Sequence, residues 1–440
     1  MRSMGRRIGF GAIILVLLLW AGGAQAGPKN VILLIGDGMG PEQVAAGRLL
    51  VPGGELVVDQ MDPNPGSVNT SNVYGEITDS AASATAYATG FKTEYGNVSM
   101  AEDDVTVLPT NMELAIEEGM ATGILSSVYL CDATPGVWVA HAPRRSCSTI
   151  IPQQIDACPD VFLGPGETIA YKSRGKSKKG VDHVAAMAEN CGHEIVENAA
   201  ELAAAQAPND RLLGVWGGYT LMYDIDRQND PGINVPTLAE MTAKAIEVLS
   251  RDPDGFFLMV EGGGIDWMAH NKDIAGTARD VVAFDDAVAV AYDFASADGD
   301  TLVVVTADHE TGGLQLGDNP NVEFIAGVTA STDFMYGLVL RGEMSAEDVL
   351  ETYAGVTDLT QAEKDAIDAY GEMGISDALS ARANVSWLLP DGTISIAPDE
   401  GDHTLTEVPV WAFGPSPGPL EGSIDNTDIG NLLFDVVSGN

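Results

Sequence analysis

A serine at the start of a predicted helix stands between clusters of metal-ligating side chains in the sequence. Ser80 follows Asp79 and opens an alanine-rich stretch that runs to Gly90. A serine hydroxyl is a weak nucleophile that needs a base or a metal ion to activate it, and no G-x-S-x-G elbow surrounds this serine. Ligands suited to zinc and magnesium occur at Asp37, Asp266, His270, Asp308 and His309. The combination predicts a serine nucleophile that bound metal ions activate.

Apolar runs rich in Val, Ile and Leu predict buried strands of a parallel sheet. The clearest runs are Val31–Ile35, Phe256–Val260 and Thr301–Thr306. Apolar residues recur at helical spacing over 281–295, which completes a β-helix-β unit. Sites in open α/β sheets form at the carboxyl ends of strands, where Asp37, Glu261 and Asp308 fall. We therefore expect a three-layer α/β/α sandwich with a large, mostly parallel central sheet.

The pattern changes from strands to helices after about residue 316. The residues from Thr360 to Glu363 form a capping box, and a strand pattern returns only at Val408–Phe413. We interpret residues 317–400 as an inserted, partly helical subdomain. The catalytic α/β core then comprises residues 27–316 and returns over 401–440.

The first 26 residues have the features of a secretory signal. A basic start precedes an apolar stretch from Ile13 to Trp20 and an Ala24-Gln25-Ala26 cleavage site. The stretch is shorter than the roughly 20 residues that span a bilayer, which favours cleavage over a retained membrane anchor. We expect an exported, periplasmic or extracellular protein without a membrane anchor, and Sec and twin-arginine export both stay open.

The charge and the cysteines restrict the partners and the compartment. The net charge of −42 argues against nucleic acid as a partner, and it fits either adaptation to salt or an ordinary acidic exported protein. Four cysteines suit disulfides in an oxidising compartment. Three pairings are possible, and Cys147 with Cys158 is preferred because it closes the shortest loop.

Six separated blocks of the sequence resemble the alkaline phosphatase family. They are Asn30–Gly40, Thr78–Gly90, Asp132–Pro135 with Arg145, Val260–His270, Thr306–Gly313, and His403–Thr404 followed by Asn426–Gly430. The resemblance covers most of the chain after the signal, apart from the insertion. One such block would be weak support, whereas six in order are highly specific.

The resemblance implies a role for each of these residues. Asp266, His270 and His403 resemble the ligands of a first zinc ion. Those of a second zinc ion would be Asp37, Asp308 and His309. The magnesium ligands would be Thr134 and Glu261 with a second oxygen of Asp37, while Asp132 would hold waters of that ion. Arg145, rather than Arg144, would bind two phosphate oxygens. Trp267 stands where some members carry lysine and others histidine or tryptophan.

The function that the resemblance implies is hydrolysis of phosphate monoesters through a phosphoserine at Ser80, with release of inorganic phosphate. The sequence offers few residues that would contact a leaving group, so we expect broad specificity among phosphate monoesters. Family members are commonly homodimers, so the resemblance also implies a homodimer. A sulfatase is disfavoured because no cysteine opens a C-x-P-x-R motif. A phosphodiesterase of the same superfamily typically uses threonine and lacks the magnesium site. A phosphate-binding or metal-storage protein without turnover would need no nucleophile.

Overall fold

The computed structural model describes residues 27–166, 182–230, 232–415 and 420–439. The predicted signal, residues 1–26, lies outside the described residues. Within the described part of the chain, no helix is long and apolar enough to cross a membrane.

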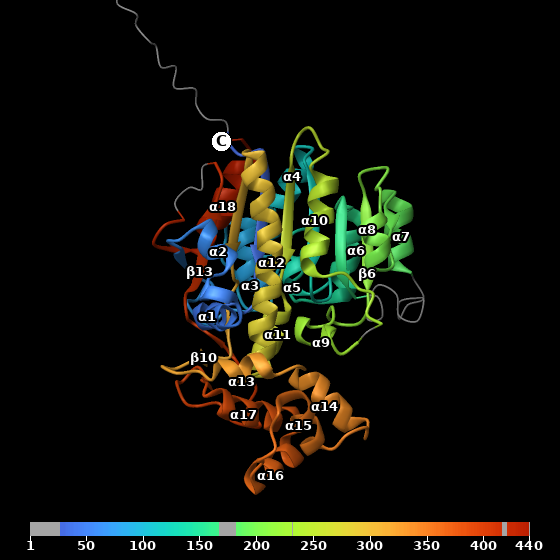
Figure 1. Cartoon of the computed structure of the whole chain (residues 1–440). Coiled ribbons are helices and arrows are strands. Elements are labelled where there is room, and N and C mark those ends of the chain that lie inside the picture. Colours follow the sequence, from blue (N-terminus) through green and yellow to red (C-terminus); the bar gives the residue numbers. More distant parts are fainter. Residues whose placement is uncertain (1–26, 167–181, 231, 416–419, 440) are drawn as a thin grey trace, which may run out of the picture.

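A sheet of ten strands forms the centre of the structure (Figure 1). Its order is β14-β2-β13-β8-β1-β7-β3-β4-β6-β5, and every neighbouring pair is parallel except the two that β13 makes with β2 and β8. The strands are β1 (Asn30–Ile35), β2 (Gly66–Asn69), β3 (Ala121–Ser126), β4 (Val161–Pro165), β5 (Glu194–Ile195), β6 (Leu212–Trp216), β7 (Phe256–Glu261), β8 (Thr301–Thr306), β13 (Val408–Phe413) and β14 (Ser423–Asp425). This mostly parallel sheet confirms the predicted fold class.

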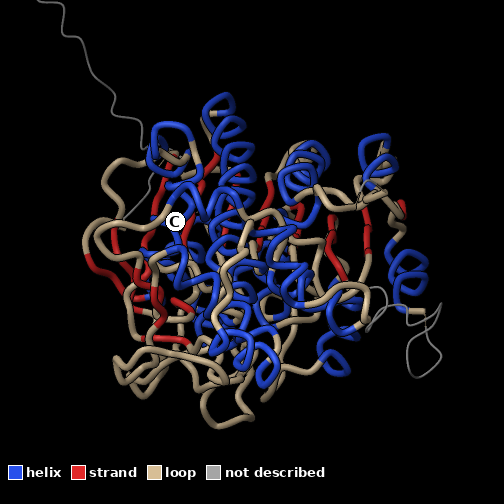
Figure 2. The backbone as a smooth tube through the Cα atoms, turned by 60° about the horizontal axis from the view of Figure 1, so that its bottom comes forward, coloured by secondary structure: helices blue, strands red, loops and turns tan. Residues whose placement is uncertain are grey.

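Helices cover both faces of the sheet (Figure 2). They include α1 (Pro41–Leu50), α2 (Val57–Met61), α3 (Ser80–Thr89), α4 (Asn111–Glu117), α5 (Ala133–Gly136), α6 (Cys147–Ala157), α7 (His183–Cys191), α8 (Ala199–Ala204), α9 (Asp224–Arg227), α10 (Leu238–Leu249), α11 (Gly264–His270), α12 (Ile274–Asp298) and α18 (Asn426–Val437). In α12, Val281, Phe284, Val288 and Ala295 are buried, as their helical spacing predicts. Strands covered on both faces are buried throughout, so their sequences are continuously apolar.

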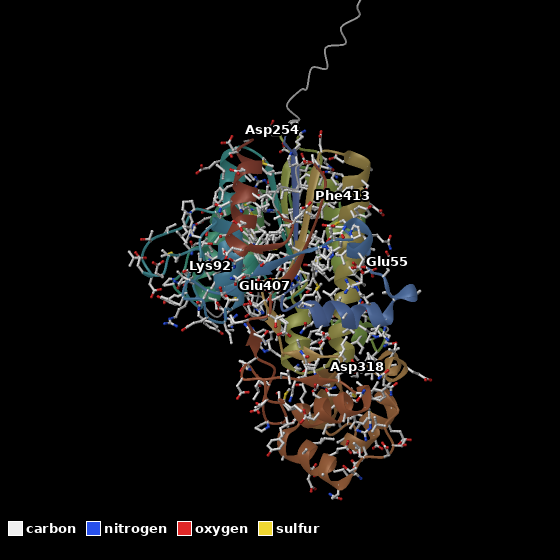
Figure 3. All side chains as sticks on the ribbon, turned by 90° about the vertical axis from the view of Figure 1, so that its left-hand side faces the viewer. Glu55, Lys92, Asp254, Asp318, Glu407 and Phe413 are labelled. Atoms are coloured by element: carbon white, nitrogen blue, oxygen red, sulfur yellow. A yellow bond between two sulfur atoms is a disulfide. The ribbon has the colours of Figure 1, made fainter. Side chains whose placement is uncertain are left out.

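Five further helices lie beyond one end of the sheet, below Asp318 in Figure 3. They are α13 (Val322–Gly327), α14 (Thr332–Leu340), α15 (Ala346–Ala354), α16 (Gln361–Tyr370) and α17 (Glu372–Ala383). The predicted capping box is present, since Thr360 and Glu363 bond reciprocally at the start of α16. These helices build their own apolar core, which also takes in Ala269 and Ala275. We propose that residues 317–400 form the inserted subdomain.

Two polar contacts connect these helices to the part of the chain that carries the sheet. The Lys272 side chain is fully buried, and its Nζ lies 3.0 Å from Oδ1 of Asp377 in α17. At the start of α14, the Ser331 backbone N–H and hydroxyl donate to the Asp226 carboxylate at 2.7 and 2.6 Å. Burial raises the pKa of Asp226 to about 6 despite these two donors, and Asp273 and Asp333 add to the shift.

This carboxylate predicts a pH dependence of stability. An unfolded aspartate titrates near pKa ~3.9, so the folded state holds the Asp226 proton more tightly, and the free energy of unfolding should fall as pH rises from about 4 to 6. Asp226→Asn should remove this loss of stability. The change in the free energy of unfolding that the substitution causes should be more stabilising at pH 8 than at pH 4, by on the order of 2 kcal/mol. Urea unfolding at both pH values measures the difference. The exposed Asp318→Asn is the control, and equal pH dependence in wild type and Asp226→Asn would contradict the assignment.

The two disulfides correct the preferred pairing of Cys147 with Cys158. Cys131 pairs with Cys147 and Cys158 with Cys191, with Cα atoms 5.1 and 5.8 Å apart. Cys147 begins α6 and Cys158 caps its end, so the rise of the helix separates them by about 16 Å. A disulfide requires Cα atoms within about 7 Å, so a disulfide between Cys147 and Cys158 is excluded.

Candidate active site

Three predicted ligands lie together at the carboxyl ends of adjacent strands. Ile35 of β1 is in register with Glu261 of β7 and with Thr306 of β8, and Asp37 and Asp308 each follow two residues beyond these strand positions. Asp308 and Glu261 are fully buried, and Asp37 is nearly so. The parallel register therefore gathers three carboxylates at one point, as the sequence predicts.

Ser80 faces this cluster from the first turn of α3. Asp79 caps the helix by accepting from the Ala82 N–H at 3.1 Å, and it also accepts from Gly96 N–H at 3.0 Å. These bonds fix the start of the helix and hold the buried Ser80 in place. Its Oγ lies 3.2 Å from Nε2 of His309.

Backbone carbonyls orient two further histidines. Nδ1 of His270 lies 2.5 Å from the Gly401 carbonyl oxygen, and Nδ1 of His403 lies 2.9 Å from that of Thr78. Each carbonyl accepts a hydrogen bond from Nδ1, which leaves the lone pair on Nε2. The two Nε2 atoms lie 3.2 Å apart. Two facing lone pairs repel unless a shared cation or proton lies between them, so this arrangement is typical of metal-binding histidines.

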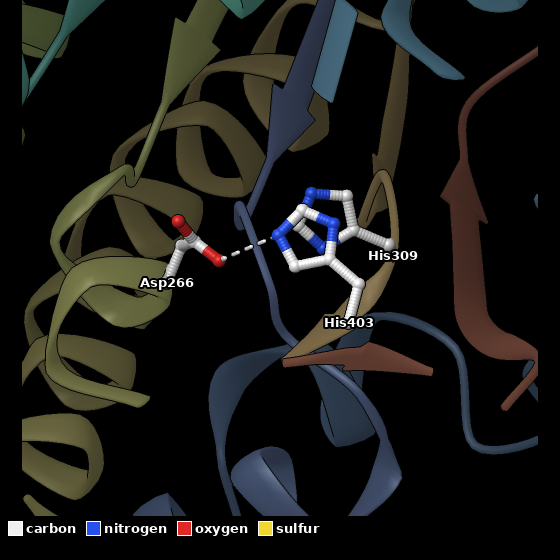
Figure 4. A group of neighbouring side chains, drawn as sticks. All are labelled: Asp266, His309 and His403. Carbon is white, nitrogen blue, oxygen red and sulfur yellow. Dashed lines mark ion pairs between the residues drawn. The ribbon is translucent and has the colours of Figure 1, made fainter. Parts of the chain in front are cut away.

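Two groups of ligand atoms are close enough to hold metal ions. Asp37, Asp308 and His309 form one group, and Asp266, His309 and His403 form the other (Figure 4), with atoms within 4.8 Å of one another in each. His270 adjoins the second group, because its Nε2 lies 3.4 Å from Oδ2 of Asp266. The stacked rings of His309 and His403, with centroids 3.6 Å apart, place the two groups side by side.

Buried carboxylates crowd at this point and repel one another. Burial, followed by Asp308 and Asp266, raises the pKa of Asp37 well above its ordinary value. Burial also raises the pKa of Glu261 well above its ordinary value and that of Asp308 to about 7. The pKa of His309 is lowered well below its ordinary range, first by burial and then by His403 and His270. A bound cation would relieve this repulsion.

Unpaired buried oxygens mark the same place. Sixteen buried side-chain polar atoms of the described residues lack a hydrogen-bond partner, and four of them lie here: Asp37 Oδ1, Asp308 Oδ2, Glu261 Oε1 and Thr134 Oγ1. Unpaired polar atoms are rare in protein interiors, and each needs an explanation such as an ion. All four belong to predicted ligands, so the residues present fit divalent cations.

The residues predicted to bind magnesium lie on the side of β7 and α5. Ser126, at the end of β3, donates to Oε2 of Glu261 and leaves Oε1 for a ligand. Thr134 is buried in α5, and Asp132 caps that helix through the Ala133 N–H at 2.8 Å. Asp132 contributes to the raised pKa values of Asp37 and Glu261, so it lies within electrostatic reach of both.

A cavity of about 540 Å³ opens over these residues. Ser80, Asp132, Arg145 and Trp267 are among its lining residues. The Arg145 side chain is 48 % exposed, and its Nη1 lies 3.9 Å from Oδ1 of Asp132. A guanidinium with this freedom can close onto an anion that enters beside Ser80.

Thr311, for which the sequence predicts no role, contacts both groups. Its hydroxyl donates to Oδ1 of Asp266 at 2.5 Å and lies 3.1 Å from Nδ1 of His309. It therefore connects ligands of both groups. In the sequence, the signal for this role of Thr311 is its position two residues after the predicted ligand His309.

Comparisons with known proteins place this arrangement in a family. The model of the alkaline phosphatase family matches residues 28–438. Alkaline phosphatase 3 of Bacillus subtilis (strain 168) is 32% identical over 446 residues, which cover 95% of this chain and 91% of the relative. The alkaline phosphatase of Escherichia coli (strain K12) is 36% identical over 335 residues, which cover 64% of this chain and 70% of the relative.

Solved structures agree with the sequence comparison. The crystal structure of Thermus thermophilus alkaline phosphatase has a TM-score of 0.84 at 26% identity, covering 94% of this chain and 92% of the other. That of the cold-active alkaline phosphatase from a Shewanella species has a TM-score of 0.79 at 28% identity, covering 93% and 99%. The chain is thus a phosphomonoesterase with an α/β fold. It belongs to the alkaline phosphatase family, whose metal-dependent members hydrolyse phosphate monoesters.

Proposed function

We propose that this protein is an exported alkaline phosphatase that transfers the phosphoryl group of a monoester to Ser80 and then to water. The observation that carries the proposal is the position of Ser80. Its hydroxyl lies at a helix start, 3.2 Å from His309 and beside buried ligand oxygens that lack partners. A nucleophile in such surroundings serves covalent catalysis.

The ligand types support two zinc ions and one magnesium ion. Imidazole nitrogens with carboxylates suit zinc, and the all-oxygen group of Thr134, Glu261 and Asp37 suits magnesium. Asp266, His270 and His403 would hold one zinc ion, and Asp37, Asp308 and His309 the other. A solved alkaline phosphatase variant from the Antarctic bacterium TAB5 has magnesium bound in a site called M3. When bound, such ions would lower the pKa of a hydroxyl or water and offset charge on phosphoryl oxygens.

The protein's own residues position the substrate for two displacements. The Arg145 guanidinium grips two phosphate oxygens in a fork, and the N-terminus of α3 favours negative charge at Ser80. Ser80 Oγ loses its proton to solvent and bonds to phosphorus as the bond to the alcohol oxygen breaks. The alcohol leaves protonated. Water then bonds to phosphorus as the Ser80–phosphorus bond breaks, which releases inorganic phosphate and restores the serine.

Hydrolysis of three p-nitrophenyl esters tests this function. The phosphate monoester should release p-nitrophenol with a burst of phosphoenzyme, and the sulfate and the bis-ester should react at least ~10³-fold more slowly. Faster turnover of the sulfate or the bis-ester would replace the proposal with a sulfatase or a diesterase. Binding of phosphate without turnover of any ester would indicate a binding protein.

Export and a homodimeric state complete the proposal. The features of the first 26 residues and the even number of cysteines, which form two disulfides, support an oxidising compartment outside the cytosol. The family resemblance supports a homodimer.

Trp267 predicts weak product binding. It lines the cavity with Asp132 and Arg145 but carries no charge, so phosphate is held by Arg145 and the metal ions alone. Trp267→Lys should lower both the inhibition constant for inorganic phosphate and kcat, by ~3- to 10-fold each on the scale of one added charge contact. The decrease in kcat is expected because product release limits the turnover of many enzymes. Trp267→Gln, which removes the ring without adding charge, is the control. Unchanged phosphate inhibition in a folded, metal-loaded Trp267→Lys protein would show that Trp267 only packs against the cavity wall.

A further inference from the structure

Three aromatic rings form a continuous patch beside the cavity. The ring of Tyr129 lies 5.9 Å from the rings of both Tyr219 and Trp267, and the rings of Tyr219 and Trp267 are 6.4 Å apart. Tyr129 and Trp267 line the cavity that contains Ser80. Tyr219 extends the patch away from the cavity, and we call the three residues the aromatic patch.

The patch starts next to the proposed reacting centre. Trp267 lies in α11 between Asp266 and His270, two of the residues proposed to hold a zinc ion. An in-line displacement requires the leaving group on the side of phosphorus opposite Ser80. Since Ser80, Tyr129 and Trp267 line the same cavity, the alcohol part of a bound ester can contact the aromatic patch there.

Tyr219 has features of a contact residue for a ligand rather than of a core residue. It is 58% exposed, so its ring is open to a ligand. Its backbone is nevertheless held, because Thr220 bridges to Val128 and the Leu221 N–H donates to the Ser127 carbonyl at 2.8 Å. An exposed ring on a fixed backbone can receive a planar group at little cost in conformational entropy.

The size and charge of the cavity narrow the choice of ligand. Its volume of about 540 Å³ falls in the range of about 300–1,000 Å³ of small-molecule sites and exceeds the needs of a phosphoryl group. The exposed carboxylates of Glu400 and Asp402 also line it. These charges disfavour an anionic leaving group and permit a neutral one.

We propose that the aromatic patch stacks an uncharged planar ring of the leaving group and so selects nucleoside monophosphates among monoesters. This inference rests on the proposed function and refines the expectation of broad specificity. Tyr219 is its specificity-determining residue. Stacking on aromatic side chains is tolerant of base identity, since every base has a π-face.

The test compares two esters with the same leaving oxygen. Adenosine 5′-monophosphate and methyl β-ribofuranoside 5-phosphate are both primary alkyl phosphates and differ only in the base. For the full chain loaded with zinc and magnesium, the ratio of their kcat/KM values should favour the nucleotide by about 5- to 30-fold, as base stacking gives. Tyr219→Ala should lower this ratio at least threefold, which corresponds to about half of the stacking free energy. Tyr219→Phe should leave the ratio unchanged.

Tyr370→Ala, at an exposed tyrosine that ends α16, is the matched control and should leave the ratio unchanged. A wild-type ratio within about twofold of unity would overturn the proposal. Equal losses on both esters in Tyr219→Ala, with the ratio unchanged, would also do so and would indicate a structural role.

A binding measurement separates this proposal from the proposed function. Calorimetric titration of the metal-loaded Ser80→Ala protein with both esters should show the same preference for the nucleotide and its loss on addition of Tyr219→Ala. If neither ester is hydrolysed by wild type, the proposed function fails. The ratio of the two dissociation constants then still decides whether the patch binds a base.

Discussion

Replacing Ser80 with alanine should abolish the phosphoenzyme and lower kcat/KM by at least ~10³-fold, because the nucleophile of the first displacement is lost. Ser80 Oγ lies 3.2 Å from His309 Nε2 at the start of α3, so alanine should leave the helix and the ligand groups in place. Residual turnover would come from water that attacks the bound ester directly. Acid quench with labelled substrate, followed by peptide mapping, measures the phosphoserine.

A second serine of the same helix supplies the control for this prediction. Ser83 is fully buried one turn further on, and its Oγ accepts from Nδ2 of Asn426 at 3.2 Å. Ser83→Ala should therefore affect stability and keep the phosphoenzyme. Stoichiometric phosphoserine at any residue other than Ser80 would reject the assignment.

Removal of metal should abolish turnover and lower the melting temperature together. The buried carboxylates Asp37, Glu261 and Asp308 have raised pKa values without a cation, so their repulsion should destabilise the metal-free fold, and a cation that binds only the folded state stabilises it. Elemental analysis of the purified protein should give about two zinc ions and one magnesium ion per chain. Full activity after exhaustive chelation would contradict the proposed centre.

Thr134 allows the magnesium position to be tested separately. Its hydroxyl is buried without a hydrogen-bond partner, and valine has almost the same shape. Thr134→Val should leave the melting temperature of the metal-free protein nearly unchanged, since no hydrogen bond is lost. It should reduce bound magnesium while zinc stays near the wild-type level. Equal loss of both metals would show that Thr134 serves the fold rather than one ion.

The proximity of several candidate site residues could be predicted from the sequence, because adjacent strands of a parallel sheet end side by side. Asp37, Glu261 and Asp308 could be grouped once their strands were recognised, since adjacent parallel strands end at the same edge. Helical spacing likewise placed Asp266 and His270 on one face of a helix. The assigned roles of these residues stay predictions until the metal and mutant measurements are made.

Contacts between segments far apart in the sequence could not be predicted from strand ends or helical spacing. The predicted pairing of Cys147 with Cys158 is wrong because a short separation in sequence is not a short distance in space. Helix α6 lies between the two cysteines and holds them apart. The aromatic patch joins Tyr219, on a connection after β6, to Trp267 in α11. No local pattern relates these two residues, and tyrosine at an exposed turn is common. Such contacts follow only from the packing of distant segments.

The chain order of the ligands has a consequence for biosynthesis. Asp37 and His403 are far apart in the sequence, and β12 (His403–Thr404) pairs with β9 (Glu310–Thr311) across the residues of the proposed insertion. Closing so long a loop is slow, because its entropy is lost before the contacts form. A nascent or truncated chain therefore lacks the last histidine of the centre and its contact with Thr78. Catalytic competence should therefore appear only after the segment around His403 has been synthesised and has packed against β9.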